Sequence, residues 1–460
     1  MRIDKIEIKN FRAYRDLTLA FGNRCTVFIG KNGSGKSSVI SALRKGLSFV
    51  FSENKGEINP LKSNNNATVR SFSITDTRYD DATGFNWPTS LKYEVTFGGM
   101  ALKWEFFKKG DPGGLHSTLY RDARNTILEA LKQDSSTWPL LAFFGDSYPH
   151  HEMNFGAKAS KVIKSDSIPM DFAYYGWDEY QNCNVLWFER FKYIDNYLFD
   201  INRKIEGRGL MIIDQQIKML EELLKSLHTE ADKQRNLDIL GQLEELRIQR
   251  KSLVPESIIA RRELFASEKK YIEDRIVKFT GPASEKYRFI NDEFAVSGVS
   301  ASKIAKSDYS VRFEFAKGGA VFAEMLPMGY KRLLHIVFDL AYRAFILTKG
   351  EREPQGVVMI DEVELHLHPT LQQEVIHRFQ NAFPEIQFVF STHSPLAISN
   401  ILVDGEACKL IKLDVQEGNY TMQYVGNIYG IDYATSLTEV MGAKHRKSES
   451  LIATSFGQYS

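Results

Sequence analysis

The sequence contains few cysteines and no long apolar run. Its three cysteines, Cys25, Cys183 and Cys408, lie far apart in 460 residues. An odd and scattered count excludes a disulfide scaffold and a paired-cysteine metal site, and it fits a reduced, cytoplasmic protein. No apolar run reaches about 18 residues, so we expect no membrane span. The first residues, 1–6, alternate in polarity and include an acid, unlike a signal peptide.

A charge excess of one sign is also missing. The chain has 59 Lys and Arg against 58 Asp and Glu, a net charge of +1. This balance gives no attraction of the whole molecule to nucleic acid, although a local basic patch would still permit DNA binding. The hydrophobic fraction of 43% is enough for one large domain with insertions or for several smaller domains.

A glycine-rich octapeptide, residues 30–37, gives the first positive signal. It reads GKNGSGKS and fits the P-loop pattern G-x-x-x-x-G-K-[ST] without a mismatch. The apolar residues 25–29 before it predict a buried strand, and residues 38–43 after it predict a helix. This context favours a phosphate-binding loop over a glycine-rich turn with an incidental lysine.

The pattern gives most residues of this loop a role in binding the phosphates of a nucleotide. We expect Lys36 to reach the β- and γ-phosphates and Ser37 to bind Mg²⁺ through its hydroxyl. The other residues expected to contact the nucleotide are Asn32, Gly33, Ser34, Gly35 and Ser38.

Four apolar residues, 357–360, are followed by two carboxylates, Asp361 and Glu362. In a P-loop protein, we expect this strand to lie beside the P-loop strand and to bring Asp361 to the Mg²⁺. Glu362 would then orient or deprotonate a water near the γ-phosphate. The pattern alone is weak, and it gains weight from the P-loop in the same chain.

Two other side chains are candidates for the site. His393 follows an apolar run, and at the end of a strand it either contacts the γ-phosphate or has a structural role; its place after the two-carboxylate strand favours the contact. Arg12 precedes the P-loop closely, and it either faces the nucleotide or is a solvated arginine in a turn. The His-His-Glu cluster at 150–152 is interpreted as a surface loop rather than a metal site.

The remaining periodicities predict a mixed α/β chain. Leucines recur at helical spacing over 201–280 among charges of both signs, with Pro255 as an interruption, which predicts an inserted arm of two or more helices. The arm either binds a partner or nucleic acid, or packs on the body. Elsewhere we expect strands over 1–21, 91–107, 139–145, 309–322, 356–360, 386–390, 408–413 and 420–425, and helices over 117–132, 326–344 and 371–383.

These motifs resemble the ABC-type ATPases of the RecF and overcoming-lysogenization-defect branch, also called AAA15. The segments that carry the likeness are 8–12, 30–37, 357–362, 364–369 and 391–395. The resemblance implies an ATPase head split into residues 1–200 and 281–460, with an antiparallel β subdomain and the inserted arm, 201–280. It also implies head-to-tail pairing of two heads, or a higher even oligomer, with each ATP between two subunits.

The same resemblance places the signature segment of the family at 326–332. Gly329 of this segment is kept and would contact the nucleotide of the partner head. Pro327 stands where a serine hydroxyl is usual, and Tyr330 replaces an acid, so we expect slow hydrolysis. His393 would be the switch histidine, and the glutamine-loop residue is not identified.

The tail, residues 429–442, resembles the ATPases of Septu anti-phage systems and those that accompany retrons. This likeness implies a sensor and regulator ATPase that holds an HNH nuclease partner. No nuclease centre is visible in this chain. The alternative is a RecF-like repair or recombination ATPase that binds DNA directly. The trigger, the nuclease-contact surface and the effect of ATP on the nuclease stay open.

Overall fold

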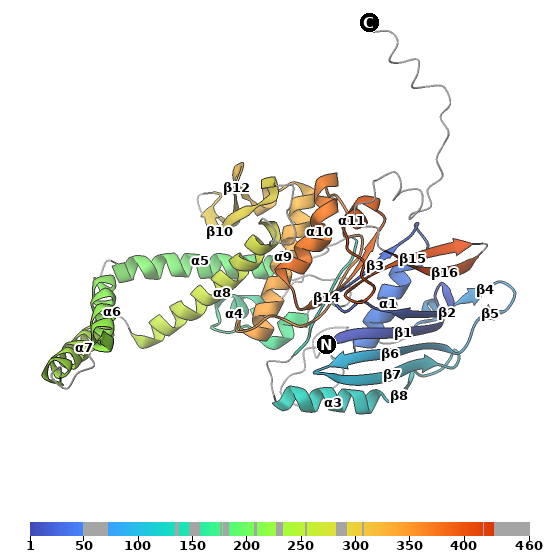
Figure 1. Ribbon diagram of the computed structural model, residues 1–460, viewed down its shortest axis with the longest axis horizontal. Coiled ribbons are helices and arrows are strands. Elements are labelled where there is room, and N and C mark those ends of the chain that lie inside the picture. Colours follow the sequence, from blue (N-terminus) through green and yellow to red (C-terminus); the bar gives the residue numbers. More distant parts are fainter. Residues whose placement is uncertain are drawn as a thin grey trace, which may run out of the picture.

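The computed structural model describes residues 1–48, 72–133, 138–146, 157–174, 177, 184–206, 209–226, 233–253, 255–281, 292–305, 308–416 and 418–426. These residues form a head from which a helical arm projects (Figure 1). The His-His-Glu cluster at 150–152 and the tail at 429–442 lie outside this range. No helix of the described part is long and apolar enough to cross a membrane.

A mostly parallel sheet of six strands forms the centre of the head, in the order β16-β15-β3-β14-β13-β9. Neighbours from β15 to β9 are parallel, and β16 pairs with β15 in the antiparallel sense. The strands β3, β9, β13 and β14 are buried along their whole length, as expected for parallel strands covered on both faces. The bounds are β3 Cys25–Ile29, β9 Leu140–Phe144, β13 Gly356–Ile360, β14 Ile386–Thr392, β15 Cys408–Gln416 and β16 Asn419–Val425.

The predicted neighbour of the P-loop strand is wrong. We expected the strand that precedes Asp361, β13, to lie beside β3, but β14 lies between them. Parallel strands need a long crossover, so their order in the sheet need not follow their order in the chain. Here the helix α10, Pro369–Ala382, connects β13 to β14, and β14 occupies the place next to β3. All three strands end at the same edge of the sheet, where Asp361 follows β13.

A second, antiparallel sheet has the order β2-β1-β6-β7-β8. It contains both predicted hairpins, and buried residues alternate along β6 from Leu91 to Phe97. Gln387 of β14 bonds the backbone of Ile3 at 2.8 Å, which ties the two sheets together. The bounds are β1 Arg2–Phe11, β2 Tyr14–Ala20, β6 Thr89–Phe97, β7 Met100–Lys108 and β8 His116–Thr118, with β4 Tyr79–Asp80 and β5 Gly84–Phe85 as a separate pair.

Helices cover these sheets, and a third small sheet packs against the helices at the base of the arm. The helix after the P-loop, α1, contacts the antiparallel sheet, since Tyr93 donates to the carbonyl of Ala42 at 2.7 Å. The helix α9 is buried along most of its length. The remaining bounds in the head are α1 Lys36–Leu47, α3 Tyr120–Gln133, α4 Ala157–Lys164, α9 Met328–Thr348, α11 Pro395–Ser399, β10 Val296–Lys303, β11 Tyr309–Phe315 and β12 Gly319–Phe322.

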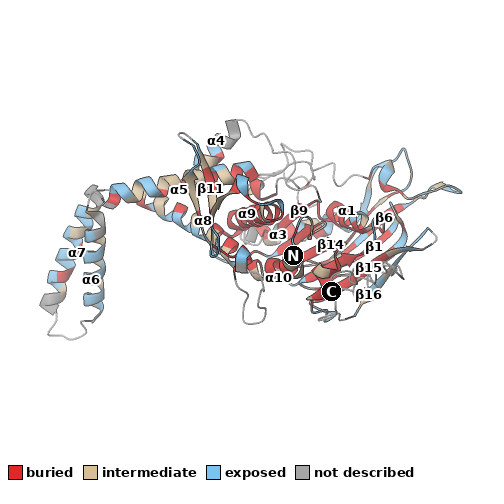
Figure 2. Cartoon of the chain, turned by 90° about the horizontal axis from the view of Figure 1, so that it is seen from above, coloured by how far each residue is buried: buried red, intermediate tan, exposed pale blue. Residues whose placement is uncertain are grey.

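The arm consists of four helices, α5 Asn184–Glu206, α6 Leu210–Ser226, α7 Lys233–Leu253 and α8 Glu256–Thr280. The helices α5 and α8 run out from the head and back, and α6 and α7 form the far end (Figure 1). The far end is largely exposed, whereas buried residues concentrate in the head (Figure 2). Pro255 caps the start of α8, as its position predicts, and the predicted arm boundary at residue 201 falls inside α5.

The α/β class, the split head, the antiparallel sheet and the inserted helical arm are therefore confirmed. Residues from both ends of the chain share one central sheet, because β3 pairs with both β14 and β15.

Candidate nucleotide-binding site

The loop between β3 and α1 has the backbone of a phosphate cradle. Gly33 and Gly35 have φ angles of +79° and +94°, which side chains rarely allow. A Cβ atom at Gly35 would lie 2.3 Å from the hydroxyl of Tyr14, so this position also has no room for a side chain. The loop leads directly into the N-terminus of α1 at Lys36, where free N–H groups favour an anion.

Lys36 crosses the loop from the first turn of α1. Its ammonium group donates to the carbonyls of Gly30 at 2.8 Å and Lys31 at 3.0 Å. Burial lowers the pKa of Lys36 to about 8, against the opposing effect of nearby carboxylates such as Asp361. A buried cation that bonds neutral carbonyls gains from a polyanionic ligand, and a triphosphate supplies that charge.

The second half of the site comes from 324 positions further along the chain. The hydroxyl of Ser37 donates to Asp361 Oδ2 at 3.1 Å. Ser391, at the end of the intervening strand β14, donates to Asp361 Oδ1 and accepts from the backbone N–H of Glu362 at 3.0 Å. Ser391 thus fixes the turn that carries both carboxylates.

The pair Ser37 and Asp361 fits Mg²⁺. A hydroxyl and a carboxylate oxygen are the hard ligands that Mg²⁺ takes, usually with several waters and the phosphate oxygens of a substrate. The described residues contain no cluster of three or more His, Cys, Asp or Glu side chains that could hold a metal alone. The chain therefore offers a site that a nucleotide would complete.

Glu362 adopts a φ of +47°, which is unusual for a residue with a side chain. The buried guanidinium of Arg332 holds this turn, since it donates to the carbonyls of Asp361 and Glu362 at 2.9 Å each. Burial raises the pKa of Glu362, and the carboxylates of Asp361 and Glu364 act in the same direction. A raised pKa makes the ionised carboxylate a stronger base.

His393 closes the same group of side chains. Its Nε2 lies 3.7 Å from Glu362 Oε1, and its Nδ1 lies 3.5 Å from the ammonium of Lys36. The backbone N–H of His393 donates to Glu364, which holds the residue in place. Burial and the nearby Lys36 lower the pKa of His393, so the neutral imidazole is favoured.

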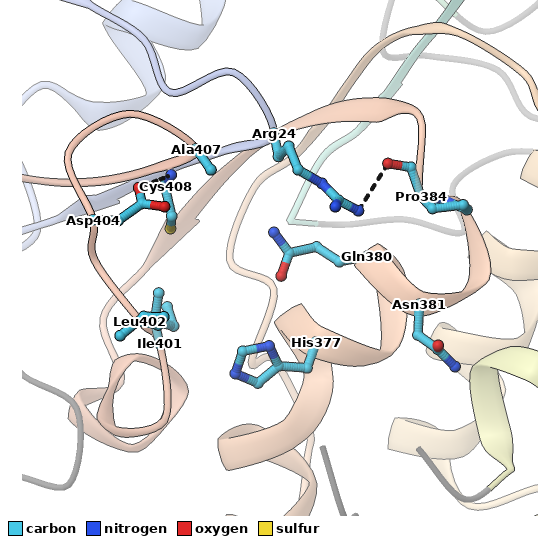
Figure 3. Close-up of a pocket in the computed structure, with 10 residues that line it drawn as sticks. All are labelled: Arg24, His377, Gln380, Asn381, Pro384, Ile401, Leu402, Asp404, Ala407 and Cys408. Atoms are coloured by element: carbon cyan, nitrogen blue, oxygen red, sulfur yellow. Dashed lines mark hydrogen bonds between the residues drawn. The ribbon is translucent and has the colours of Figure 1, made fainter. Parts of the chain in front are cut away.

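These side chains line one pocket of about 330 Å³. Its lining residues are Ala13, Asn32, Gly33, Gly35, Lys36, Ser37, Ser38, Asp361, Glu362, His393 and Tyr420. A second pocket of about 300 Å³ lies at the opposite, amino-terminal edge of β3, where Arg24 donates to the carbonyl of Pro384 at 2.8 Å (Figure 3). That pocket contains no residue of the P-loop.

Three predicted site residues do not line this pocket. The side-chain oxygen of Ser34 is buried within the loop without a hydrogen-bond partner among the described residues. Arg12 pairs with Asp76 at 3.0 Å. Gly329 lies in the first turn of α9, where an added Cβ would meet the carbonyl of His366 at 2.4 Å. A packing requirement thus explains this glycine without a ligand.

Sequence patterns did not identify several residues that shape the site. Ala13 and Tyr420 line the pocket, and Ser391 and Arg332 position the two carboxylates. The polar run after β14 included Ser391, but no local motif gave it a role. The sequence pattern indicated Arg332 only as a charged residue of the signature segment.

Comparisons with known proteins agree with this geometry. The family model AAA_15, AAA ATPase domain, matches residues 1–398. The retron Vc95 probable ATPase of Vibrio cholerae is 24% identical over 426 residues, covering 89% of this chain and 73% of the relative. The Septu protein PtuA of Bacillus mycoides is 34% identical over 102 residues, covering 22% of this chain and 14% of the relative.

Two further similarities are more limited. The DNA replication and repair protein RecF of Lactococcus lactis is 42% identical over 43 residues, covering 9% of this chain and 12% of the relative. The Smc head domain of Pyrococcus furiosus, solved with an extended coiled coil and bound to part of ScpA, aligns with a TM-score of 0.45 at 16% identity, covering 92% of this chain and 96% of that structure.

The strand-loop-helix and the carboxylates at the end of β13 define a P-loop ATPase with an inserted arm. The chain belongs to the AAA ATPase domain family AAA_15. The expected resemblance to RecF, Septu and retron ATPases is confirmed.

Proposed function

We propose that the pocket binds ATP with Mg²⁺ and hydrolyses it. The observation that carries the proposal is the 3.1 Å contact between Ser37 and Asp361, which brings both halves of the site together. When bound, Mg²⁺ would neutralise charge on the β- and γ-phosphates. Lys36 would donate to the oxygens of the same phosphates.

Glu362 and His393 act at the γ-phosphate end. Glu362 accepts a proton from the attacking water, and Arg332 keeps its backbone in the required conformation. His393 lies between Glu362 and Lys36, where its ring contacts the γ-phosphate. The partner head supplies Gly329 and its neighbours to cover the nucleotide. Arg12 remains a candidate contact, in competition with its pairing to Asp76.

Single substitutions test the ATPase assignment. Lys36→Ala should abolish ATP binding measured by titration calorimetry, because it removes the buried cation of the loop. The matched control is Lys31→Ala, which removes an exposed lysine of the same loop and should leave binding within about twofold. Equal binding by the Lys36 and Lys31 variants would refute the assignment.

Glu362→Gln should keep ATP binding, lose hydrolysis by about 100-fold or more, and accumulate paired heads. Hydrolysis at the wild-type rate would contradict the role of Glu362 as base. We also expect slow wild-type turnover, since Pro327 lacks the hydroxyl of the usual serine. A kcat well above about 10 per second, a typical enzyme median, would contradict that expectation.

We further propose that the protein is the sensor and regulator subunit of an anti-phage complex and that it holds an HNH nuclease. The similarity to a retron ATPase over 89% of this chain supports a role in defence. The match to PtuA supports the Septu-like arrangement. The similarity to RecF covers 9% of this chain, so we favour the defence role over direct DNA repair.

Co-purification tests this second proposal. A tagged chain expressed with the HNH protein of a neighbouring gene should retain that protein, and the mixture should cut DNA, whereas the chain alone should not. Cleavage by the chain alone would contradict the proposal. Binding to DNA ends or gaps without a nuclease, with the steep salt dependence of phosphate contacts, would favour the RecF-like alternative.

A further inference from the structure

The nucleotide pocket has two chemically different regions. One region holds charged groups suited to phosphates and a metal ion, and it centres on Lys36 and Asp361. The other region is lined by the methyl group of Ala13 and the aromatic ring of Tyr420. The proposed function assigns the charged region to the triphosphate and leaves the second region without a ligand group.

Tyr420 adjoins the P-loop through its contact with Tyr14. Its ring makes a T-shaped contact with the ring of Tyr14, with centroids 5.5 Å apart and an angle of 65°. The hydroxyl of Tyr14 in turn donates to the carbonyl of Ser34 at 3.2 Å. Tyr420 therefore adjoins the Ser34 flank of the loop, whereas Asp361 contacts the other flank at Ser37.

The fold fixes Tyr420 before any ligand arrives. Its strand, β16, pairs with β15, which pairs with the P-loop strand β3. Further along β16, the hydroxyl of Tyr424 accepts from the backbone N–H of Ala20 at 2.8 Å, so the strand is also tied to β2. The ring of Tyr420 is half-buried, and a T-shaped contact uses at most one of its faces. The same ring lines the nucleotide pocket, so a planar ligand group bound there would contact it.

We propose that Tyr420 is the stacking surface for the base of a purine nucleoside triphosphate. The inference rests on the proposed ATP site and adds where the base lies. The loop holds the α- and β-phosphates, so the base leaves the loop away from the γ-phosphate end. An aromatic ring at that exit excludes water from one face of the base, and stacking does not depend on which purine is bound.

The test separates the base from the phosphates. Tyr420→Ala should weaken binding of ATP with Mg²⁺ about 5- to 100-fold in titration calorimetry, the range for loss of one stacked base. Binding of inorganic tripolyphosphate with Mg²⁺ should stay within about twofold, since this probe has no base. Tyr420→Phe should bind ATP like the wild type, because it keeps the ring.

Gln423→Ala is the matched control, since it shortens an exposed side chain of the same strand that does not line the pocket. It should affect neither ligand. The inference is overturned if Tyr420→Ala leaves ATP binding unchanged, or if it weakens ATP and tripolyphosphate equally. Both results are distinct from failure of the ATPase assignment, in which the wild type binds neither ligand or Lys36→Ala has no effect.

Discussion

His335 on α9 is a buried titratable residue outside the nucleotide pocket. It is 7% exposed, and its ring packs edge-on against that of Phe188 with centroids 4.9 Å apart. Neither ring nitrogen has a hydrogen-bond partner among the described residues. Burial, with a smaller effect from Lys331, lowers the pKa of His335 from 6.5 to about 3. The folded state therefore holds this imidazole neutral.

This neutral histidine should make the head less stable in mild acid. Below pH 6.5 the unfolded chain binds a proton at His335. The folded chain binds that proton only below about pH 3. The free energy of unfolding should therefore fall by about 2 kcal/mol from this residue between pH 7 and pH 5. Urea unfolding at both pH values measures the change.

In the variant His335→Leu, the free energy of unfolding should fall by about 2 kcal/mol less between pH 7 and pH 5 than in the wild type. His116→Leu is the control, because its side chain is exposed on β8 and stays in water in both states. If the free energy of unfolding of His335→Leu fell between the two pH values as much as that of the wild type, His335 would not be the source of the change.

At the residue scale, the sequence identified the side chains that belong to short motifs. Lys36, Ser37 and Asp361 were found because their spacing is local and fixed by chemistry. Tyr420 and Ser391 were missed because they enter the site through strand pairing with distant segments. Such contacts depend on the tertiary fold, which a short sequence motif does not predict.

At the scale of elements, a fully buried ion pair lies at the base of the arm. Arg190 of α5 and Glu268 of α8 form two hydrogen bonds, at 2.5 Å and 2.6 Å, and their side chains are 0% and 1% exposed. Arg190 also donates to the carbonyl of Val162 at 2.6 Å. The pair thus joins the outgoing and returning helices to the segment around α4.

Removal of one partner should be costly because it leaves a buried charge. Arg190→Met should lower the free energy of unfolding by about 3–5 kcal/mol, whereas the double variant with Glu268→Met should recover much of the loss. Arg247→Met, in an exposed pair with Glu221 on the far end of the arm, is the control and should cost less than about 1 kcal/mol. Equal losses for the two single variants would contradict this account.

Individual elements were easier to predict than their arrangement. The apolar runs at β9 and β13 predicted buried strands directly, because parallel strands covered on both faces need such runs. The same runs carry no information on the order of the strands in the sheet, so the position of β14 between β3 and β13 was not predicted. The strand β10, with sequence VSGVSASK, was not predicted, since serine and glycine dominate it and its pairing with β11 decides its conformation.

At the scale of the whole molecule, the position of the signature segment bears on the proposed pairing of two heads. The signature segment does not line the pocket of its own chain. Two large apolar side chains are exposed at this segment, Met325 at 64% directly before it and Met328 at 67% within it. Head-to-tail pairing would place this segment over the nucleotide of a second chain and would bury those side chains.

Mixed variants test this pairing, because each composite site needs the P-loop of one chain and the signature segment of the other. Lys36→Ala should inactivate a chain by loss of ATP binding. Met328→Asp should inactivate it by placing a negative charge against the partner's triphosphate. The change at residue 328 should not harm folding, because an acid is favourable in the first turn of α9.

Each variant alone should be inactive, but an equal mixture should recover about a quarter of the wild-type ATPase rate, since half of the dimers are mixed and one of their two sites is intact. ATPase assays after mixing, with each variant at the same total concentration as the control, measure the recovery. A mixture of Lys36→Ala with a chain that carries both substitutions should stay inactive. If the signature segment acted within its own chain, the first mixture would stay inactive too, because neither chain would hold a complete site.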